Sequence, residues 1–377
     1  MARRELFLWE PTVSPHKLPL YRALVQSGRF SRVVYVAESD LSEERRKQGW
    51  AADLDGSDEI ITSPSEDQVR ELVCGSPVDS IHIFSGMRRV PCIVTGLKAC
   101  IENERNFGLM HEPRVFNSPL GPVRLAQSFL QERPLRRHAK FVLAIGAHGP
   151  GWFRLSGYRK DRIFPFAYFI EGRQLDHRQA ASAKTIVGFL GRLEPQKGLN
   201  LLLTAAPDFP EGFKLRVAGA GSLAQRAQDA VTANPEKVEF LGTLEMRQVP
   251  EYLASLDLLV LPSTTRDDGW GVVVSEALMA GIPVLVSEAA GSSMCVATPS
   301  ILGESIPAKS SRAIVKAIDT ISTRGIFSPE LREKRNRWAV QNLSAAHGAE
   351  YLISVVEYAL AAGKAPAEFL STAPALA

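Results

Sequence analysis

The 377-residue sequence has few cysteines, and they form no recognisable metal or redox motif. The four cysteines are Cys74, Cys92, Cys100 and Cys295, with no Cys-x-x-Cys pair and no metal-ligand spacing. Such cysteines are typical of reduced, mostly buried thiols in the cytosol. We therefore expect neither a disulfide framework nor a zinc site.

Targeting and membrane-spanning signals are also missing. The apolar stretch near the N-terminus runs only from Leu6 to Trp9, which is too short for a signal peptide. Glu276 interrupts the longest candidate for a spanning helix. The sequence thus predicts a cytoplasmic protein, either soluble or attached to the inner face of the plasma membrane.

A strong excess of charge is absent as well, since the net charge is only +3. This balance argues against nucleic acid as a partner. The segment of residues 114–140 is strongly basic, however, with six basic residues against the single acid Glu132 and with apolar residues between them. These basic residues are Arg114, Arg124, Arg133, Arg136, Arg137 and Lys140. Either an amphipathic helix resting on anionic lipid or a packed helix with a solvated cationic face would explain the segment.

The chain alternates strand-like and helix-like segments almost throughout, which predicts an α/β protein with doubly wound sheets. Expected strands are 5–9, 32–37, 78–84, 106–111 and 141–145, then 185–190, 214–218, 238–241, 257–261 and 283–287. Expected helices are 18–27, 66–74, 90–101 and 123–137, then 198–205, 222–233, 246–255, 271–280, 311–323, 329–340 and 345–362.

This alternation divides the chain into two Rossmann-like domains, residues 1–172 and 184–343. A polar linker of residues 173–183 separates them. Residues 344–377 are expected to return to the first domain as a helix, followed by a frayed Ala/Pro tail. We expect the two domains to face each other across a cleft, because open α/β sheets bind ligands at the carboxyl ends of their strands.

The most informative stretch is RDDGWGVVVSEALMAGIPVLVSEAAG, from Arg266 to Gly291. It follows a strand and opens a helix at about Gly271, and such a helix N-terminus attracts anions. Glu276 lies inside this otherwise apolar helix, where a carboxylate is costly to bury without hydrogen-bond donors. The two hydroxyls of a ribose would supply them. Local backbone groups or an arginine would do so equally well.

A second loop of this kind, GRLEPQKG, follows the strand 185–190. Arg192 and Lys197 lie there beside a helix N-terminus, and together they suit a diphosphate. An ordinary strand-to-helix loop with solvated charges remains the alternative. The order Gly-Lys-Ser/Thr of a Walker A loop is absent.

Five sequence blocks in this order resemble the donor domain of the retaining glycosyltransferases of family 4, which have the GT-B fold. The blocks are GRLEPQKGLNLLL, VAGAGSL, FLGTL, LDLLVLPS and the stretch from Asp268 to MAGIPVL. The resemblance implies a nucleotide-sugar donor, whose diphosphate is held by Arg192 and Lys197 and whose ribose is held by Glu276. It also implies that Gly269, Trp270 and Gly271 offer backbone N–H groups, that Gly219 and Gly221 line the nucleotide loop, and that residue 268 faces the donor sugar.

The chain departs from the family pattern in two places. Asp268 stands where the family usually has glutamate, which puts the donor-sugar geometry in doubt; Asp267 could share its role. The usual N-terminal glycine-rich loop is replaced by PTVSPHKLP, in which His16 and Lys17 could meet an acceptor or form a surface helix start. His111 ends a strand where family members often place a histidine that meets the transferred sugar.

Two further motifs have weaker interpretations. Gly219-Ala-Gly221, with Glu239 about twenty residues later, matches a dinucleotide fingerprint, but its neighbours favour a nucleotide-sugar loop. Asp53-Leu-Asp55 matches the Asp-x-Asp of metal-dependent sugar transferases, although its polar surroundings favour a solvated loop.

The sequence therefore predicts a retaining, metal-independent hexosyltransferase without a cofactor. Its partners would be a nucleotide-sugar donor and a saccharide or lipid-linked saccharide acceptor in bacterial cell-surface polysaccharide synthesis. A sugar-nucleotide epimerase or phosphorylase of the same fold remains open, and so does an inactive nucleotide-sugar-binding scaffold.

Overall fold

The computed structural model describes residues 4–47, 58–114, 119–173, 175, 184–266, 268–360 and 363–375. These residues form two compact units. The first unit contains residues 4–46, 58–171 and 344–369, and the second contains residues 172–343 and 370–375. The motif at 53–55 and most of the expected linker lie outside the described residues.

The first unit is built on a seven-stranded parallel sheet with the order β3-β2-β1-β4-β5-β6-β7. Its strands are β1 (Glu5–Glu10), β2 (Arg32–Ala37), β3 (Ile60–Thr62), β4 (Ile81–Phe84), β5 (Asn106–His111), β6 (Phe141–Ile145) and β7 (Ile163–Phe166). The strand order reverses between β1 and β4, so this point is where an open α/β sheet binds ligands.

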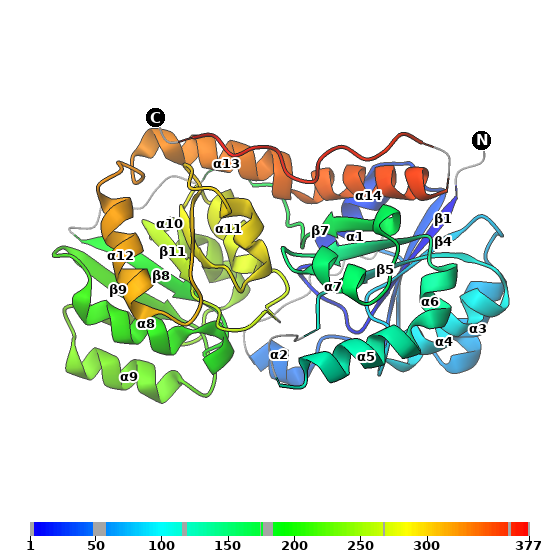
Figure 1. Cartoon of the computed structure of the whole chain (residues 1–377), viewed down its shortest axis with the longest axis horizontal. Helices are drawn as coiled ribbons and strands as arrows, with labels where there is room; N and C mark the ends of the chain where they lie inside the picture. The colour runs from blue at the N-terminus through cyan, green and yellow to red at the C-terminus, as the bar shows by residue number, and fades with distance from the viewer. Residues whose placement is uncertain are drawn as a thin grey trace. The chain divides into compact units, whose positions relative to one another are not determined.

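The helices of the first unit flank its sheet (Figure 1). They are α1 (Leu18–Gln26), α2 (Glu43–Lys47), α3 (Glu66–Cys74), α4 (Pro91–Glu102), α5 (Gly121–Gln131), α6 (Arg133–His138), α7 (Gly149–Leu155) and α14 (Ala345–Ala359). Although α14 comes from the end of the chain, it packs against α1 (Figure 1).

The second unit repeats this topology in six parallel strands, ordered β10-β9-β8-β11-β12-β13. They are β8 (Thr185–Leu190), β9 (Phe213–Ala218), β10 (Val238–Phe240), β11 (Leu258–Leu261), β12 (Val284–Ser287) and β13 (Gly303–Ile306). The helices are α8 (Leu199–Ala205), α9 (Ala224–Ala233), α10 (Val249–Ala254), α11 (Val272–Met279), α12 (Ser311–Ser322) and α13 (Pro329–Leu343). Here the order reverses between β8 and β11.

Each sheet is buried on both faces, which is why the strands read as continuous apolar runs rather than as alternating patterns. All five residues of β6 (FVLAI) are buried, and so are all four of β11 (LLVL) and of β12 (VLVS). Each unit has its own hydrophobic core between sheet and helices. The predicted pair of doubly wound α/β sheets is confirmed.

Several expected elements differ from the structure. The single helix expected over 123–137 is two helices, because α5 ends before Glu132 and Pro134 lies in the first turn of α6. The strands β3, β7 and β13 are short and were missed. The short helix α7 was missed as well.

The expectation of a frayed tail is wrong for residues 369–374. Phe369 is buried against Phe169 and Tyr351, and the backbone of Ser371 bonds to the side chains of Asn342 and Trp338. Among the described residues, no helix combines the length and the apolar character needed to cross a membrane.

Candidate active site

Two loops meet at the point where the strand order of the second unit reverses. The first runs from β8 through a 3-10 turn, Pro195–Lys197, to α8. Gly198, which begins α8, has φ +78°, and a Cβ placed there would lie 1.9 Å from the carbonyl oxygen of Pro262 in the second loop. The N–H of Thr264 donates to the Gln196 carbonyl across the same gap, at 2.8 Å. Only glycine permits this close approach of the two backbones.

The second loop, between β11 and α11, presents Asp268 to the first. Lys197 Nζ donates to Asp268 Oδ1 at 2.7 Å, and Ser263 donates to Asp268 Oδ2. The side chains of Lys197 and Asp268 are only 17% and 8% exposed, so little water screens this ion pair. The sequence predicts a role for each residue in a donor site, but it does not reveal that the two side chains pair.

The buried side chain of Trp270 holds the same loop in place. Its side chain is fully buried, and its indole N–H donates to Ser275 Oγ in α11 at 2.8 Å. The backbone carbonyls of Asp268 and Trp270 accept from the N–H groups of Gly291 and Ser292, each at 2.9 Å. The loop therefore holds its shape without a ligand, and Trp270 contributes a side-chain anchor that sequence reasoning missed.

The start of α11 offers hydrogen-bond donors. Gly271 has φ +79°, and a Cβ there would clash with Leu261 at 2.5 Å. The N–H groups of Gly269 and Gly271 make no hydrogen bond to any residue that the structure describes. The first N–H groups of α11 also lack intrahelical acceptors, and its dipole adds positive potential. This arrangement suits an anion.

Glu276 lies one turn into α11 and is half-buried. Desolvation raises the pKa of its carboxyl to about 7, and only the charge of Arg173 opposes that shift. No described residue donates a hydrogen bond to it. Within the described residues the local backbone does not satisfy this carboxyl, while the nearby charge of Arg173 leaves the arginine alternative open. The group is also suited to accept hydrogen bonds from a ligand.

Arg192 is exposed at the carboxyl end of β8 and makes no hydrogen bond to the described part of the chain. Beside it, Gly219 and Gly221 have φ +138° and +152°. A Cβ at Gly219 would lie 1.9 Å from the Gly191 carbonyl oxygen, so this glycine loop packs directly on the β8 loop. Glu239 of the alternative dinucleotide fingerprint is paired with Arg216 at 2.9 Å.

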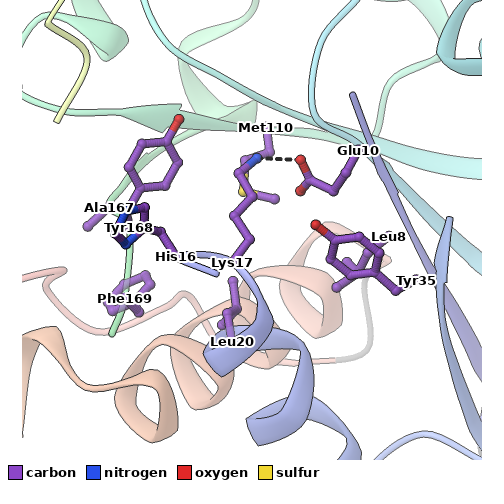
Figure 2. Close-up of a pocket in the computed structure, with 10 residues that line it drawn as sticks. All are labelled: Leu8, Glu10, His16, Lys17, Leu20, Tyr35, Met110, Ala167, Tyr168 and Phe169. Atoms are coloured by element: carbon purple, nitrogen blue, oxygen red, sulfur yellow. Dashed lines mark hydrogen bonds and ion pairs between the residues drawn. The ribbon is translucent and has the colours of Figure 1, made fainter. Parts of the chain in front are cut away.

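The reversal point of the first unit also carries an ion pair, drawn in Figure 2. Lys17 Nζ donates to Glu10 Oε2 at 2.6 Å and to Ser85 Oγ at 2.8 Å, while Ser85 donates to Glu10 Oε1 at 2.6 Å. Burial raises the pKa of Glu10, although Lys17 opposes that shift. The ammonium also lies 5.5 Å from the ring centroid of Tyr168. Lys17 is therefore not part of a solvated surface pair.

Two histidines of the first unit, His16 and His111, are held neutral by burial. Burial lowers the pKa of His16 to about 4 and also lowers that of His111. His111 Nδ1 contacts the Glu112 carbonyl oxygen, which can only accept, so Nδ1 carries the proton and Nε2 is left as an acceptor. His16 and Lys17 line a cavity of about 10 Å³, roughly the room of one water molecule.

Sequence reasoning missed several residues of these sites, including Ser263, Thr264, Glu10 and Ser85. Glu10 ends β1 and Ser85 follows β4, so a search for polar residues at strand ends would have found both. Within the described ranges, no three His, Cys, Asp or Glu side chains gather as metal ligands would. The weak Asp267 alternative lies outside those ranges.

Comparison with known structures identifies the class of fold. A structure of HepE from Anabaena in complex with UDP aligns with a TM-score of 0.70 at 17% identity, covering 94% of this chain and 100% of that one. The apo form of WaaB, a lipopolysaccharide outer core galactosyltransferase, aligns with a TM-score of 0.66 at 14% identity, covering 94% and 99%. The chain has the GT-B fold, as the sequence predicted.

Sequence comparison finds a family match within the second unit. Residues 173–342 match the model of the family Glycosyl transferases group 1. A GDP-mannose-dependent monoacylated alpha-(1-6)-phosphatidylinositol monomannoside mannosyltransferase from Corynebacterium glutamicum is 27% identical over 167 residues. That match covers 41% of this chain and 42% of the relative, so the chain spans less than half the length of that curated relative.

Proposed function

We propose that the protein is a retaining glycosyltransferase that moves a hexose from a nucleotide sugar to an acceptor hydroxyl. The observation that carries this proposal is the joined pair of loops in the second unit. They carry Lys197 and Arg192 on one loop, and Asp268, the start of α11 and the half-buried Glu276 on and after the other. The match to the glycosyl transferases group 1 family over the same residues supports it.

In this proposal the donor diphosphate binds between the β8 loop and the start of α11. Arg192 binds it with a forked guanidinium group, and Lys197 binds it as a compact charge. The N–H groups of Gly269 and Gly271 add neutral donors. Since the leaving group is a diphosphate, stabilising its developing charge is the main catalytic task. These groups can perform it without a metal ion.

Glu276 binds the two ribose hydroxyls, which replace the water that the half-buried carboxyl lacks. Gly219 and Gly221 let the adjoining loop lie close to the nucleotide. Asp268 has both oxygens occupied in the unliganded site. When the diphosphate draws Lys197 toward it, Oδ1 becomes available to a hydroxyl of the donor sugar.

The first unit supplies the acceptor side. His111 offers Nε2 as an acceptor for a sugar hydroxyl, and its lowered pKa keeps it neutral at pH 7. His16 and Lys17 line the neighbouring cavity. Positioning an acceptor hydroxyl against the anomeric carbon would supply much of the rate.

We also propose a role in bacterial cell-surface polysaccharide synthesis. A lipopolysaccharide galactosyltransferase among the structural neighbours and a phosphatidylinositol-mannoside mannosyltransferase among the relatives support this role. The apolar side chains of Val123, Phe129 and Leu130 in α5 are exposed, and the exposed basic residues Arg133 and Arg137 follow in α6. This face would rest on the anionic inner surface of the plasma membrane. Leu130→Asp should then reduce sedimentation with anionic vesicles.

The test is a calorimetric titration with UDP, GDP, ADP, CDP and their sugar conjugates, with EDTA present throughout. Micromolar binding of one nucleotide, lost in Arg192→Ala and Glu276→Ala, would support a metal-independent donor site. Analysis of products then separates the alternatives, since an epimerase leaves the nucleotide sugar intact and a phosphorylase consumes inorganic phosphate. Absence of binding to every nucleotide would contradict the proposal, whereas nucleotide-sugar binding without any product would favour the inactive scaffold.

A further inference from the structure

A group of arginines lies at the carboxyl edge of the first sheet, in addition to the Lys17–Glu10 ion pair. Arg88 and Arg89 follow β4, Arg114 follows β5, and Arg124 lies in α5. The carboxyl ends of parallel strands share one edge of a sheet, which is where α/β proteins bind ligands. We call these four residues the arginine cluster.

Two members of the cluster are fixed in place by α5 and its C-terminal end. Arg88 donates to Glu132 Oε1 at 2.6 Å and to Ser128 Oγ at 3.3 Å. Arg114 donates to Ser128 Oγ at 3.0 Å and to Gln127 at 3.0 Å. Because Ser128 is fully buried and Glu132 is 1% exposed, both guanidinium groups have defined positions.

The cluster has more positive charge than this structural role requires. Burial lowers the pKa of Arg114, and the charges of Arg88, Arg124 and Arg89 lower it further, against the single opposing charge of Glu132. The positive charges of Arg88, Arg89 and Arg124 thus all act on Arg114, while Glu132 is paired with Arg88. Like charges at this density destabilise a fold unless an anion joins them.

Arg89 gives a second reason to look for a ligand. It is exposed, makes no hydrogen bond to a described residue, and has φ +67°, a region that side chains other than glycine rarely adopt. The structure thus keeps an arginine at a position where glycine would be more stable. Strain of this kind concentrates at binding sites.

We infer that the arginine cluster binds a phosphate or diphosphate group carried by the acceptor. Guanidinium groups pair with phosphate oxygens through forked hydrogen bonds, and several guanidinium groups held close together suit a dianion better than a single carboxylate. The cluster also adjoins His111, whose pKa responds to Glu132 and Arg88. The identification of the ligand as the acceptor rests on the proposed function. The inference that the site binds phosphate is independent of it.

The experiment is a calorimetric titration with inorganic pyrophosphate, using the whole protein in an Arg192→Ala/Lys197→Ala background to silence the donor site. The cluster variants are Arg89→Gly, Arg114→Gln and the pair Arg88→Gln/Glu132→Gln, which leaves no buried carboxylate unpaired. Lys309→Gly is the matched control, since it also removes one exposed cation at positive φ (+63°), in the second unit.

We expect each cluster variant to lose pyrophosphate affinity by roughly tenfold or more, while Lys309→Gly binds as its parent does. Arg89→Gly should also keep or raise the melting temperature, which separates lost binding from lost structure. Pyrophosphate binding that is absent, or that survives all three variants, would overturn the inference.

A second arm identifies the source of the phosphate. Vesicles of phosphatidylcholine with and without phosphatidic acid are sedimented with the protein. If the cluster variants reduce binding to phosphatidic acid, the phosphate lies on a lipid; if only pyrophosphate binding falls, it lies on a soluble acceptor. Nucleotide binding by the second unit is measured separately in the protein with an intact donor site. If this protein bound no nucleotide, the proposed function would be wrong, but the inference of a phosphate site would be unaffected.

Discussion

The two units place similar groups at the points where their strand orders reverse. In the first, Lys17 pairs with Glu10 at 2.6 Å beside Ser85; in the second, Lys197 pairs with Asp268 at 2.7 Å beside Ser263. Ser85 directly follows β4, the fourth strand of the first unit, and Ser263 lies two residues after β11, the fourth strand of the second unit.

The loops around these pairs differ. Glu10 is the last residue of β1 and is 2% exposed, whereas Asp268 lies on a loop that leads through Gly269 and Gly271 into α11. Both pairs lie near a helix start, because Lys17 is the residue that precedes α1. The second unit adds Gly269 and Gly271 beside its pair, whereas residues 10–17 of the first unit contain no glycine. The shared sheet thus positions a pair of charges in each unit, while the backbone around the two pairs differs.

The largest expected difference between the two pairs concerns nucleotide binding. Lys197→Ala should weaken binding of the nucleoside diphosphate by about 3 kcal/mol, more than 100-fold, because a buried cation on phosphate is lost. Lys17→Ala should leave that affinity within about twofold, since it lies in the other unit. Calorimetric titration checks both. Equal losses in the two variants would break the comparison.

The second largest expected difference concerns how tightly the backbone packs around a glycine in each unit. Gly198→Ala places a Cβ 1.9 Å from the Pro262 carbonyl oxygen, so it should lower the free energy of unfolding by about 3 kcal/mol. At Gly86, which follows β4 in the first unit, the nearest atom would be 3.6 Å away. Gly86→Ala should therefore cost only about 1 kcal/mol of backbone strain. Urea unfolding measures both, and a tolerated Gly198→Ala would show that the two loops are not held together tightly.

Lys17→Met should destabilise the protein by about 2 kcal/mol, because Glu10 would remain buried without its cation. The double variant Lys17→Met/Glu10→Gln should recover most of this loss, since a neutral amide costs less to bury. Thermal unfolding of the single and double variants gives the result. A single variant as stable as the wild type would mean that the pair is a ligand site alone, without a structural contribution.

The raised pKa of Glu276 should make the stability of the protein depend on pH. Its pKa is raised to about 7 in the folded protein from 4.5, so the folded state holds the proton more tightly and stability falls as pH rises through that window. Glu276→Gln should stabilise the unliganded protein by about 1–2 kcal/mol at pH 8, after allowance for partial exposure, and hardly at pH 4.

The same variant should bind nucleotide more weakly at pH 8, because an amide accepts less well than a carboxylate from ribose hydroxyls. The opposite signs of the two effects are the signature of a binding carboxylate. A variant that is destabilised at pH 8 would indicate that Glu276 has a structural partner instead.

The fold was largely predictable because buried parallel strands leave long apolar runs, such as FVLAI and LDLLVL, that stand out from the helices between them. The edge strands β3, β7 and β13 escaped prediction because they contain only three or four residues each. The break in the helix over 123–137 depends on Pro134, which was visible in the sequence but tolerated in a first helical turn.

The residues of the proposed donor site could be selected from the sequence, because Arg192, Lys197, Asp268 and Glu276 lie in contiguous motifs after two strands. The pairing of Lys197 with Asp268 was not, since those residues are 71 positions apart and meet only through the strand order. Glu10 and Ser85 in the first unit likewise come from separate strands, 75 positions apart. Contacts across a reversal point are set by topology, which local patterns do not encode.

We propose that the nucleotide binds at the reversal point of the second unit. Hydrogen exchange, followed by mass spectrometry with and without the nucleotide that titration selects, can locate the bound nucleotide. We expect the strongest protection in residues 191–198 and 263–276, and we expect it to be lost in Lys197→Ala at the same ligand concentration. Strongest protection in residues 10–17 and 85–89 instead would contradict it, because the ligand would then occupy the first unit.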